Sequence, residues 1–252
     1  MKDDLGFSMA FAAPPRRIVS LVPSLSEALA VTVPDRLVAV TDWCTHPPGL
    51  DLPRVRGTKN PDRAAIVALK PDLVVANQEE NRRLDVDRLR AAGVPVWVTA
   101  IESLNDALTS MRRLFTDVLA VGEPDWLRAA AAEWRHPAPR PRLRVAVPIW
   151  RDPWMVVGAR TFTGDLLARL GLDNVFGTGE ARYPRVELDE LHAAAPELVL
   201  LPDEPYVFTP DDGPEAFPGL RTVLVPGRRL TWYGPSLATA RGELLDLVRP
   251  EP

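Results

Sequence analysis

Aromatic side chains are the residues of this sequence best suited to hold a ligand, because several stand in turn-rich segments next to expected strands. Flat, stiff rings bury a large area of a planar or apolar molecule and lose little conformational entropy. Trp150 stands beside such a segment, whereas Trp97 lies inside an apolar run and is expected to fill the core. The aromatic residues expected to contact a ligand are Trp43, Trp154, Tyr183, Tyr206 and Trp232.

Cys44 and His46 are the candidates for metal ligation, since they stand two positions apart in one loop. A thiolate and an imidazole could ligate a soft metal or supply an axial ligand. Two side chains do not make a site, and the favoured interpretation is that Cys44 packs beneath the Pro47–Pro48 turn while His46 bonds the backbone.

The usual signatures of nucleotide binding and serine hydrolysis are missing from the sequence. It contains no Gly-x-Gly-x-x-Gly after a strand, no phosphate-binding Gly-Lys-Ser/Thr loop and no Gly-x-Ser-x-Gly elbow. Neighbouring acids such as Asp189 and Glu190 could exchange protons, but such pairs usually face solvent. We therefore expect no enzyme, no catalytic residue and no intrinsic cofactor.

Length and charge exclude several other classes of protein. A chain of 252 residues with 46% hydrophobic residues can bury one large core or two modest ones. A net charge of −4 argues against nucleic acid as a partner, and one cysteine excludes an internal disulfide. No apolar stretch is long enough to span a membrane, and the start does not read as a signal peptide. As written, the sequence indicates a cytoplasmic monomer.

Strands and helices alternate along the chain, which predicts an α/β fold with parallel sheets. Ser24 is expected to cap a helix, with Glu27 at capping-box spacing. The expected strands are 17–22, 37–41, 73–76, 94–99, 143–147, 154–157, 198–201 and 222–225. The other expected helices are 61–70, 81–92, 103–121, 163–170, 188–194 and 236–248.

A helix from Pro124 to His136 is expected to separate two similar halves of the chain. Pro124 suits its first turn, and Pro137, Pro139 and Pro141 prevent its continuation. On either side, the segment 68–76 is echoed by the segment 194–201. The predicted domains are an N-terminal α/β lobe at 1–123, a connecting helix at 124–137 and a C-terminal α/β lobe at 138–252.

A series of short motifs resembles one family along nearly the whole chain. The motifs are Arg-Ile-Val-Ser-Leu-Val-Pro-Ser at 17–24, Gly-Thr-Lys-Asn-Pro at 57–61, Leu-Lys-Pro-Asp-Leu-Val at 69–74, Asp-Pro-Trp-Met at 152–155 and Thr-Trp-Tyr-Gly-Pro at 231–235. Their order resembles the helical backbone metal receptors, the cobalamin- and siderophore-binding proteins of ABC importers. The resemblance implies two Rossmann-like lobes joined by a single helix, with the ligand in a cleft between them.

The resemblance also implies roles for particular residues. The aromatic cleft residues of the family fall on Trp43, Tyr183 and Trp232, and the loop after the strand at Leu73 would supply Asn77, Gln78 and Glu79. An acid of the C-terminal lobe that docks on an ABC permease would fall on Asp189 or Glu190. Its N-terminal counterpart falls near Ala64, which has no charge.

The sequence therefore predicts a non-enzymatic protein that binds a large metal chelate, cobalamin or another corrinoid first. A ferric siderophore or haem-type receptor is the alternative of the same fold, with Arg151, Arg182 and Arg185 as cations for an anionic chelate. A metal- or corrinoid-handling enzyme or chaperone that uses Cys44 and His46 is the alternative of another class. The family would imply a periplasmic or cell-surface location if the start is truncated.

Overall fold

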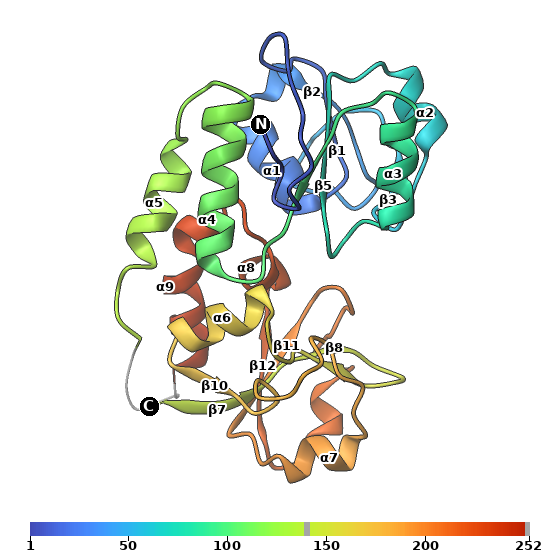
Figure 1. Ribbon diagram of the computed structural model, residues 1–252. Helices are drawn as coiled ribbons and strands as arrows, with labels where there is room; N and C mark the ends of the chain where they lie inside the picture. The colour runs from blue at the N-terminus through green and yellow to red at the C-terminus, as the bar shows by residue number, and fades with distance from the viewer. Residues whose placement is uncertain (139–141, 250–252) are drawn as a thin grey trace. The chain divides into compact units, whose positions relative to one another are not determined.

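Two four-stranded parallel sheets organise residues 1–138 and 142–249, the part of the chain that the computed structural model describes (Figure 1). Contacts divide the chain into two units. The first holds Met1–Ile101, Asn105–Arg128 and Tyr233–Pro235, and the second holds the described residues of Glu102–Leu104, Ala129–Trp232 and Ser236–Pro252. The predicted two-lobed α/β fold with parallel sheets is confirmed, whereas the predicted domain limits and the cleft stay predictions.

The first sheet has the strand order β2-β1-β5-β6. Its strands read as continuous apolar runs because parallel strands are covered on both faces. The strands are β1 (Ile18–Ser20), β2 (Leu37–Val40), β5 (Leu73–Asn77) and β6 (Val96–Thr99), with a short antiparallel pair β3 (Arg56–Gly57) and β4 (Asn60–Pro61). The helices are α1 (Pro23–Thr32), α2 (Arg63–Ala68), α3 (Arg83–Ala91) and α4 (Leu104–Arg113), which continues as a π-helix at Leu114–Val118.

The start of α1 differs from the sequence prediction. Val22 is the N-cap residue and Pro23 is the first helical residue, so Ser24 lies inside the first turn and is buried. Proline suits this position because its fixed φ matches the helix and its missing N–H would have no helical partner. The Ser26 hydroxyl donates to the Val22 carbonyl at 2.9 Å. The predicted capping role of Ser24 is wrong.

The second sheet repeats the connectivity of the first, with the order β10-β7-β11-β12. In both sheets, the strand that comes first in the chain lies between the second and the third. The strands are β7 (Leu143–Ala146), β10 (Leu172–Asn174), β11 (Leu198–Pro202) and β12 (Arg221–Val225), with an antiparallel pair β8 (Pro148–Trp150) and β9 (Met155–Val156). The helices are α6 (Phe162–Arg169), α7 (Leu188–Ala193), α8 (Gly227–Thr231) and α9 (Leu237–Val248).

The echo between segments 68–76 and 194–201 corresponds to the strands β5 and β11, which occupy equivalent places. β5 pairs with β1, and β11 pairs with β7. The short edge strand β10 was not expected, because Asp173 and Asn174 supply two of its three residues. Acidic and amide side chains weaken a strand pattern, yet a neighbouring strand can still pair with such an edge.

The expected helix between the halves is α5 (Asp125–Glu133), which is shorter than the predicted 124–136. The boundary between the two units falls inside it, after Arg128. Trp126 donates from its indole to the Thr32 hydroxyl at 3.0 Å within the first unit. Trp134 donates to the Leu237 carbonyl at 2.9 Å within the second. The helix and the residue that follows it thus make hydrogen bonds within each unit, while Pro139 and Pro141 lie outside the described residues.

We expect Ala131→Pro to lower the free energy of unfolding by about 3 kcal/mol, because proline removes a backbone hydrogen bond inside α5 and clashes with the preceding turn. Chemical denaturation would measure the loss. Asp125→Pro is the matched control, since position 125 is the first residue of α5 and proline is tolerated there. Equal stability of the two variants would contradict the account.

Candidate functional site

The loop after β2 carries Trp43, the most exposed tryptophan of the chain. Trp43 is 66% exposed, and a Cβ added at Gly57 would lie 3.3 Å from its indole nitrogen. The ring therefore lies against a backbone segment without a side chain. In open α/β sheets, ligands bind at the carboxyl ends of the strands, and Trp43 follows such an end.

The loop after β5, also in the first unit, carries polar groups. Gln78 is exposed, and its backbone N–H donates to the Thr99 carbonyl at 2.9 Å. Lys59 donates from its ammonium to the Glu79 carbonyl. We call Trp43, Lys59, Gln78 and Glu79 the first face, because all four belong to the first unit and stand in loops.

Asn77 was expected to contact the ligand, but its side chain is buried and engaged. Its amide nitrogen donates to the Thr99 hydroxyl at 3.0 Å. Its amide oxygen accepts the backbone N–H groups of Glu79 at 2.8 Å and Glu80 at 3.3 Å. Asn77 therefore shapes the loop that carries Gln78 and Glu79, and the structure does not support direct contact with a ligand.

Cys44 is fully buried, with its sulfur 2.9 Å from the Ser26 hydroxyl and 3.1 Å from the Thr41 hydroxyl. Burial raises the pKa of the thiol, whereas metal ligation needs the thiolate. Nδ1 of His46 lies 3.1 Å from the Thr45 hydroxyl. Across residues 1–138 and 142–249, no three His, Cys, Asp or Glu side chains gather as a metal site. The packing interpretation of Cys44 is favoured over the metal ligand.

A second group of aromatic residues lies in the second unit, on β8 and in the loop after β11. Trp150 is 43% exposed and meets Tyr206 edge to face, with ring centroids 5.8 Å apart. The Tyr206 ring also lies 4.7 Å from Phe208, and Val207 is exposed. We call Trp150, Tyr206 and Val207 the second face. The sequence pointed to Trp150 as an aromatic beside a loop but assigned it no contact role.

Arg151 fixes this second face through charged contacts. Its guanidinium donates to both Asp212 and Glu215, and it lies 5.4 Å from the centroid of the Trp154 ring. The hydroxyl of Tyr206 donates to Asp212 at 2.6 Å. Two carboxylates therefore neutralise Arg151, and the contacts tie the β8–β9 hairpin to the loop that carries Tyr206.

The same contacts shift the pKa values of Glu215 and Tyr206. The hydrogen bond from Arg151 lowers the pKa of Glu215, because it favours the charged carboxylate. The hydrogen bond that Tyr206 donates to Asp212 raises the pKa of the phenol above 10.0, because it favours the protonated form. Tyr206 therefore remains a neutral phenol at physiological pH.

Trp154 was expected in the ligand site, but the structure places it in the core of the second unit. It is 8% exposed, stacks on Phe208 at 6.1 Å and meets Phe217 edge-on at 5.4 Å. Trp154 and Val156 are both buried and stand two positions apart, which is the spacing of one face of a strand. The uninterrupted apolar run at 154–157 carried this signal in the sequence.

Trp232 is likewise buried, with 6% of its surface exposed. Its side chain bonds the carboxyl group of Glu204, which also accepts the Thr231 hydroxyl at 2.9 Å. The Arg228 guanidinium lies 5.8 Å from the ring. Burial raises the pKa of Glu204. Trp232 is thus an anchor of its segment, and its expected contact with a ligand stays a prediction.

The remaining predicted residues lie on the surface or near it. Tyr183 is half-buried, and Asp189 and Glu190 stand exposed in the first turn of α7. Glu190 accepts the backbone N–H of Glu187 at 2.8 Å, so its carboxylate caps the helix. Ala64 is exposed in the first turn of α2. The docking role of Asp189 and Glu190 stays a prediction.

No helix within residues 1–138 and 142–249 is long and apolar enough to cross a membrane. A comparison with models of protein families gives no match. Among named relatives, the vitamin B12-binding protein of Pectobacterium carotovorum is 25% identical over 203 residues, which cover 76% of this chain and 72% of the relative.

Two solved structures share the fold over most of their length. The periplasmic haem-binding protein RhuT from Roseiflexus, in its apo form, has a TM-score of 0.77 at 23% identity, with 92% of this chain and 97% of that chain covered. CeuE of Helicobacter pylori, in a nickel–histidine complex, has a TM-score of 0.83 at 16% identity, with 99% and 88% covered.

Together these similarities support the helical backbone metal receptor family for this chain. The relative is named as a vitamin B12-binding protein and one of the two structures as a haem-binding protein, in agreement with the expectation of a non-enzymatic binding protein. The exposed aromatic residues of this chain include Trp43 in the first unit and Trp150, which contacts half-buried Tyr206, in the second.

We expect Trp232→Ala to destabilise the protein by about 3 kcal/mol or more, because it removes a buried ring and leaves a cavity. Trp43→Ala should change the free energy of unfolding by less than about 0.5 kcal/mol, since the ring is exposed. Urea denaturation of both variants would measure the difference. A Trp232→Ala protein as stable as the wild type would show that the ring is not an anchor.

We expect the pKa of Tyr206 to stay above that of an ordinary tyrosine, so its contribution to stability is present below pH 10 and is lost as the pH rises through the raised pKa. Asp212→Asn should lower this pKa, because the amide is a weaker acceptor than the carboxylate. Absorbance at the tyrosinate band during an alkaline titration would follow the change, and Tyr206→Phe would identify the step. An identical titration of the wild type and Asp212→Asn would contradict the assignment.

Proposed function

We propose that this chain binds a large metal chelate, cobalamin or another corrinoid, through the first and second faces. The observation that carries the proposal is the exposure of Trp43 and of Trp150, the latter against half-buried Tyr206, on loops and strand ends where α/β proteins bind ligands. A relative named as a vitamin B12-binding protein supports the same ligand class.

The ion pairs of two candidate cations favour a corrinoid over a strongly anionic chelate. Arg151 is neutralised by Asp212 and Glu215, and Arg182 pairs with Glu102 at 2.5 Å. Lys59 donates to a carbonyl while Glu79 stands beside it. A ferric siderophore or the carboxylates of haem would need cations that are not already paired. A corrin with an amide periphery needs contact area and neutral hydrogen bonds.

The aromatic rings would supply affinity mainly by burying the macrocycle. Apolar area removed from water stabilises a complex by roughly 25 cal/mol per Å² before the entropy of association is subtracted. Rigid rings lose little conformational entropy on binding. Because Arg151 already holds the second face in place, ordering that face subtracts little from the free energy gained by burial. We therefore propose that the ligand binds a largely preformed surface.

Haem is the second candidate, and His46 is the residue that favours it. His46 is half-buried and lies three residues from Trp43, and a neutral imidazole is a common axial ligand of haem iron. Tyr206 is a poor alternative ligand, since its raised pKa keeps it protonated. The burial of Cys44 weakens the proposal of a metal-handling enzyme or chaperone that would use Cys44 with His46.

We further propose that the protein delivers its ligand to an ABC permease from the periplasm or the cell surface. Asp189 supplies an exposed acid in α7 for docking, and Glu190 stands beside it although its carboxylate caps the helix. The first unit offers uncharged Ala64 in the first turn of α2, so docking would depend more strongly on the second unit. Reconstituted permease with wild type and Asp189→Asn would test this dependence through transport rates.

Titration with hydroxocobalamin, haemin and a ferric catecholate, followed by absorbance, tests the ligand. We expect the corrinoid to bind most tightly, and Trp43→Ala and Trp150→Ala each to weaken it about thirtyfold, or about 2 kcal/mol. Trp43→Phe and Trp150→Phe keep a ring and should retain most of the affinity. Tight haemin binding without corrinoid binding, or unchanged titrations in both alanine variants, would overturn the proposal.

A further inference from the structure

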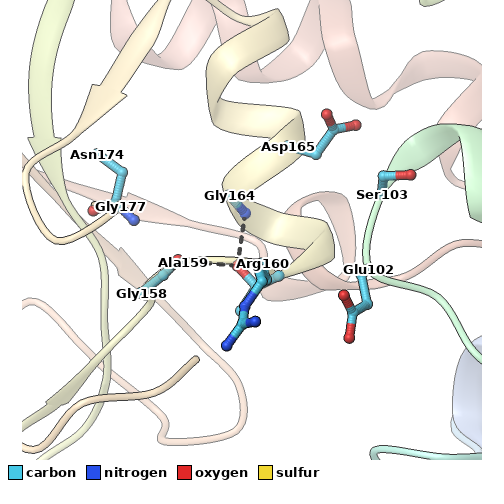
Figure 2. A pocket seen from close by; sticks show the side chains of 10 residues that line it. Glu102, Ser103, Gly158, Ala159, Arg160, Gly164, Asp165, Asn174 and Gly177 are labelled. Atoms are coloured by element: carbon cyan, nitrogen blue, oxygen red, sulfur yellow. Dashed lines mark hydrogen bonds between the residues drawn. The ribbon is translucent and has the colours of Figure 1, made fainter. Parts of the chain in front are cut away.

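A pocket of about 290 Å³ lies within the second unit, at the start of α6 and beside the end of β10. Figure 2 shows the side chains of Glu102, Arg160, Asp165 and Asn174 among the residues that line it. None of these four residues belongs to the first or the second face. The pocket is therefore a separate feature whose chemistry the proposed function does not yet use.

Both acids of the pocket already have cationic partners. Glu102 accepts from Arg182 at 2.5 Å. Asp165 accepts from Arg169 at 2.8 Å and from the Leu104 backbone N–H at 2.9 Å. Each ionised carboxylate has about four acceptor sites, so both retain the capacity to accept from a ligand.

Arg160 supplies the donor capacity of the pocket. Its guanidinium donates from Nη2 to the Glu180 carbonyl at 3.0 Å. A guanidinium carries five N–H donors in a fixed geometry, so one bond leaves capacity for others. The pocket consequently offers donors and acceptors together, and most of its charge is compensated by partners outside it.

The walls of the pocket are held in place by hydrogen bonds. Asn174 donates to the Val157 carbonyl at 2.9 Å and accepts the Phe176 N–H at 3.1 Å. Thr161 caps α6 by accepting the Gly164 N–H at 3.0 Å. A Cβ at Gly158 would lie 2.3 Å from the Ala181 carbonyl oxygen, so two backbone segments are in direct contact there. A ligand group would enter a preformed cavity and would not need to order it.

We infer that this pocket binds a neutral polar group of the amide or hydroxyl type. An amide can donate to the carboxylates of Glu102 and Asp165 and can accept from Arg160. A carboxylate has no donor for these two acids and would face their oxygens. The volume equals that of about ten water molecules at about 30 Å³ each, enough for a short amide arm. The inference rests on the proposed function, since a corrin edge carries such arms.

Two corrinoids that differ in their edge groups test the inference. Cobyric acid carries mostly amides at its edge, and cobyrinic acid carries carboxylates instead. We expect wild-type protein at pH 7 to bind the dicyano form of cobyric acid at least tenfold more tightly than that of cobyrinic acid. This measurement needs no variant, and equal affinities would overturn the inference.

Ala159→Leu places a larger side chain at the wall of the pocket without changing a charge. We expect it to lower the affinity for cobyric acid at least tenfold and to reduce the preference for amides, with a smaller effect in Ala159→Val. Ala168→Leu is the matched control, because Ala168 is exposed on α6 and does not line the pocket. Thermal unfolding would verify that each variant is folded.

The outcomes separate the inference from the proposed function. If the wild type binds no corrinoid, the proposed function fails. If it binds corrinoids and folded Ala159→Leu keeps both the affinity and the preference, the pocket inference alone fails. Loss of preference in Ala159→Leu with an unchanged Ala168→Leu protein would support it.

Discussion

The burial of parallel strands on both faces is the constraint on which the rest of the structure depends. β5 and β11 are buried along their whole length, so neither strand can present a polar group to solvent from its middle. Polar and aromatic residues with a function must follow the strands, and the Gln78 and Tyr206 loops do so. Because the strands must be buried, helices cover the middle of each sheet and the residues that could bind a ligand stand in the loops after the strands.

The fold could be predicted from the sequence because its signals are local and repeated. Apolar runs such as 73–76 and 198–201 are long enough to identify buried strands without knowledge of their partners. β10 was missed because its pairing depends on β7, which no local pattern reveals. The start of α1 was misplaced because two capping rules competed, and the fixed φ of Pro23 outweighed the hydroxyl of Ser24.

The candidate site was predicted less well, because exposure depends on tertiary contacts. Trp43 and Trp232 both stand among turn residues, yet one ring is open to solvent and the other is enclosed by Glu204 and Arg228. Asn77 follows a strand as expected, but the backbone of its own loop uses its amide. The sequence predicted which types of residue would occur in the loops of the candidate site. Only the packing of the chain shows which of them remain available.

The enclosed thiol of Cys44 also makes the protein convenient to observe. Because the sequence has a single cysteine and its sulfur lies between two hydroxyls, alkylation must await a local opening of the segment after β2. The rate of modification by a maleimide would therefore report the frequency of that opening. Because Cys44 is buried, a dye could also be attached selectively to a cysteine introduced at Gln78, with little labelling of Cys44 itself.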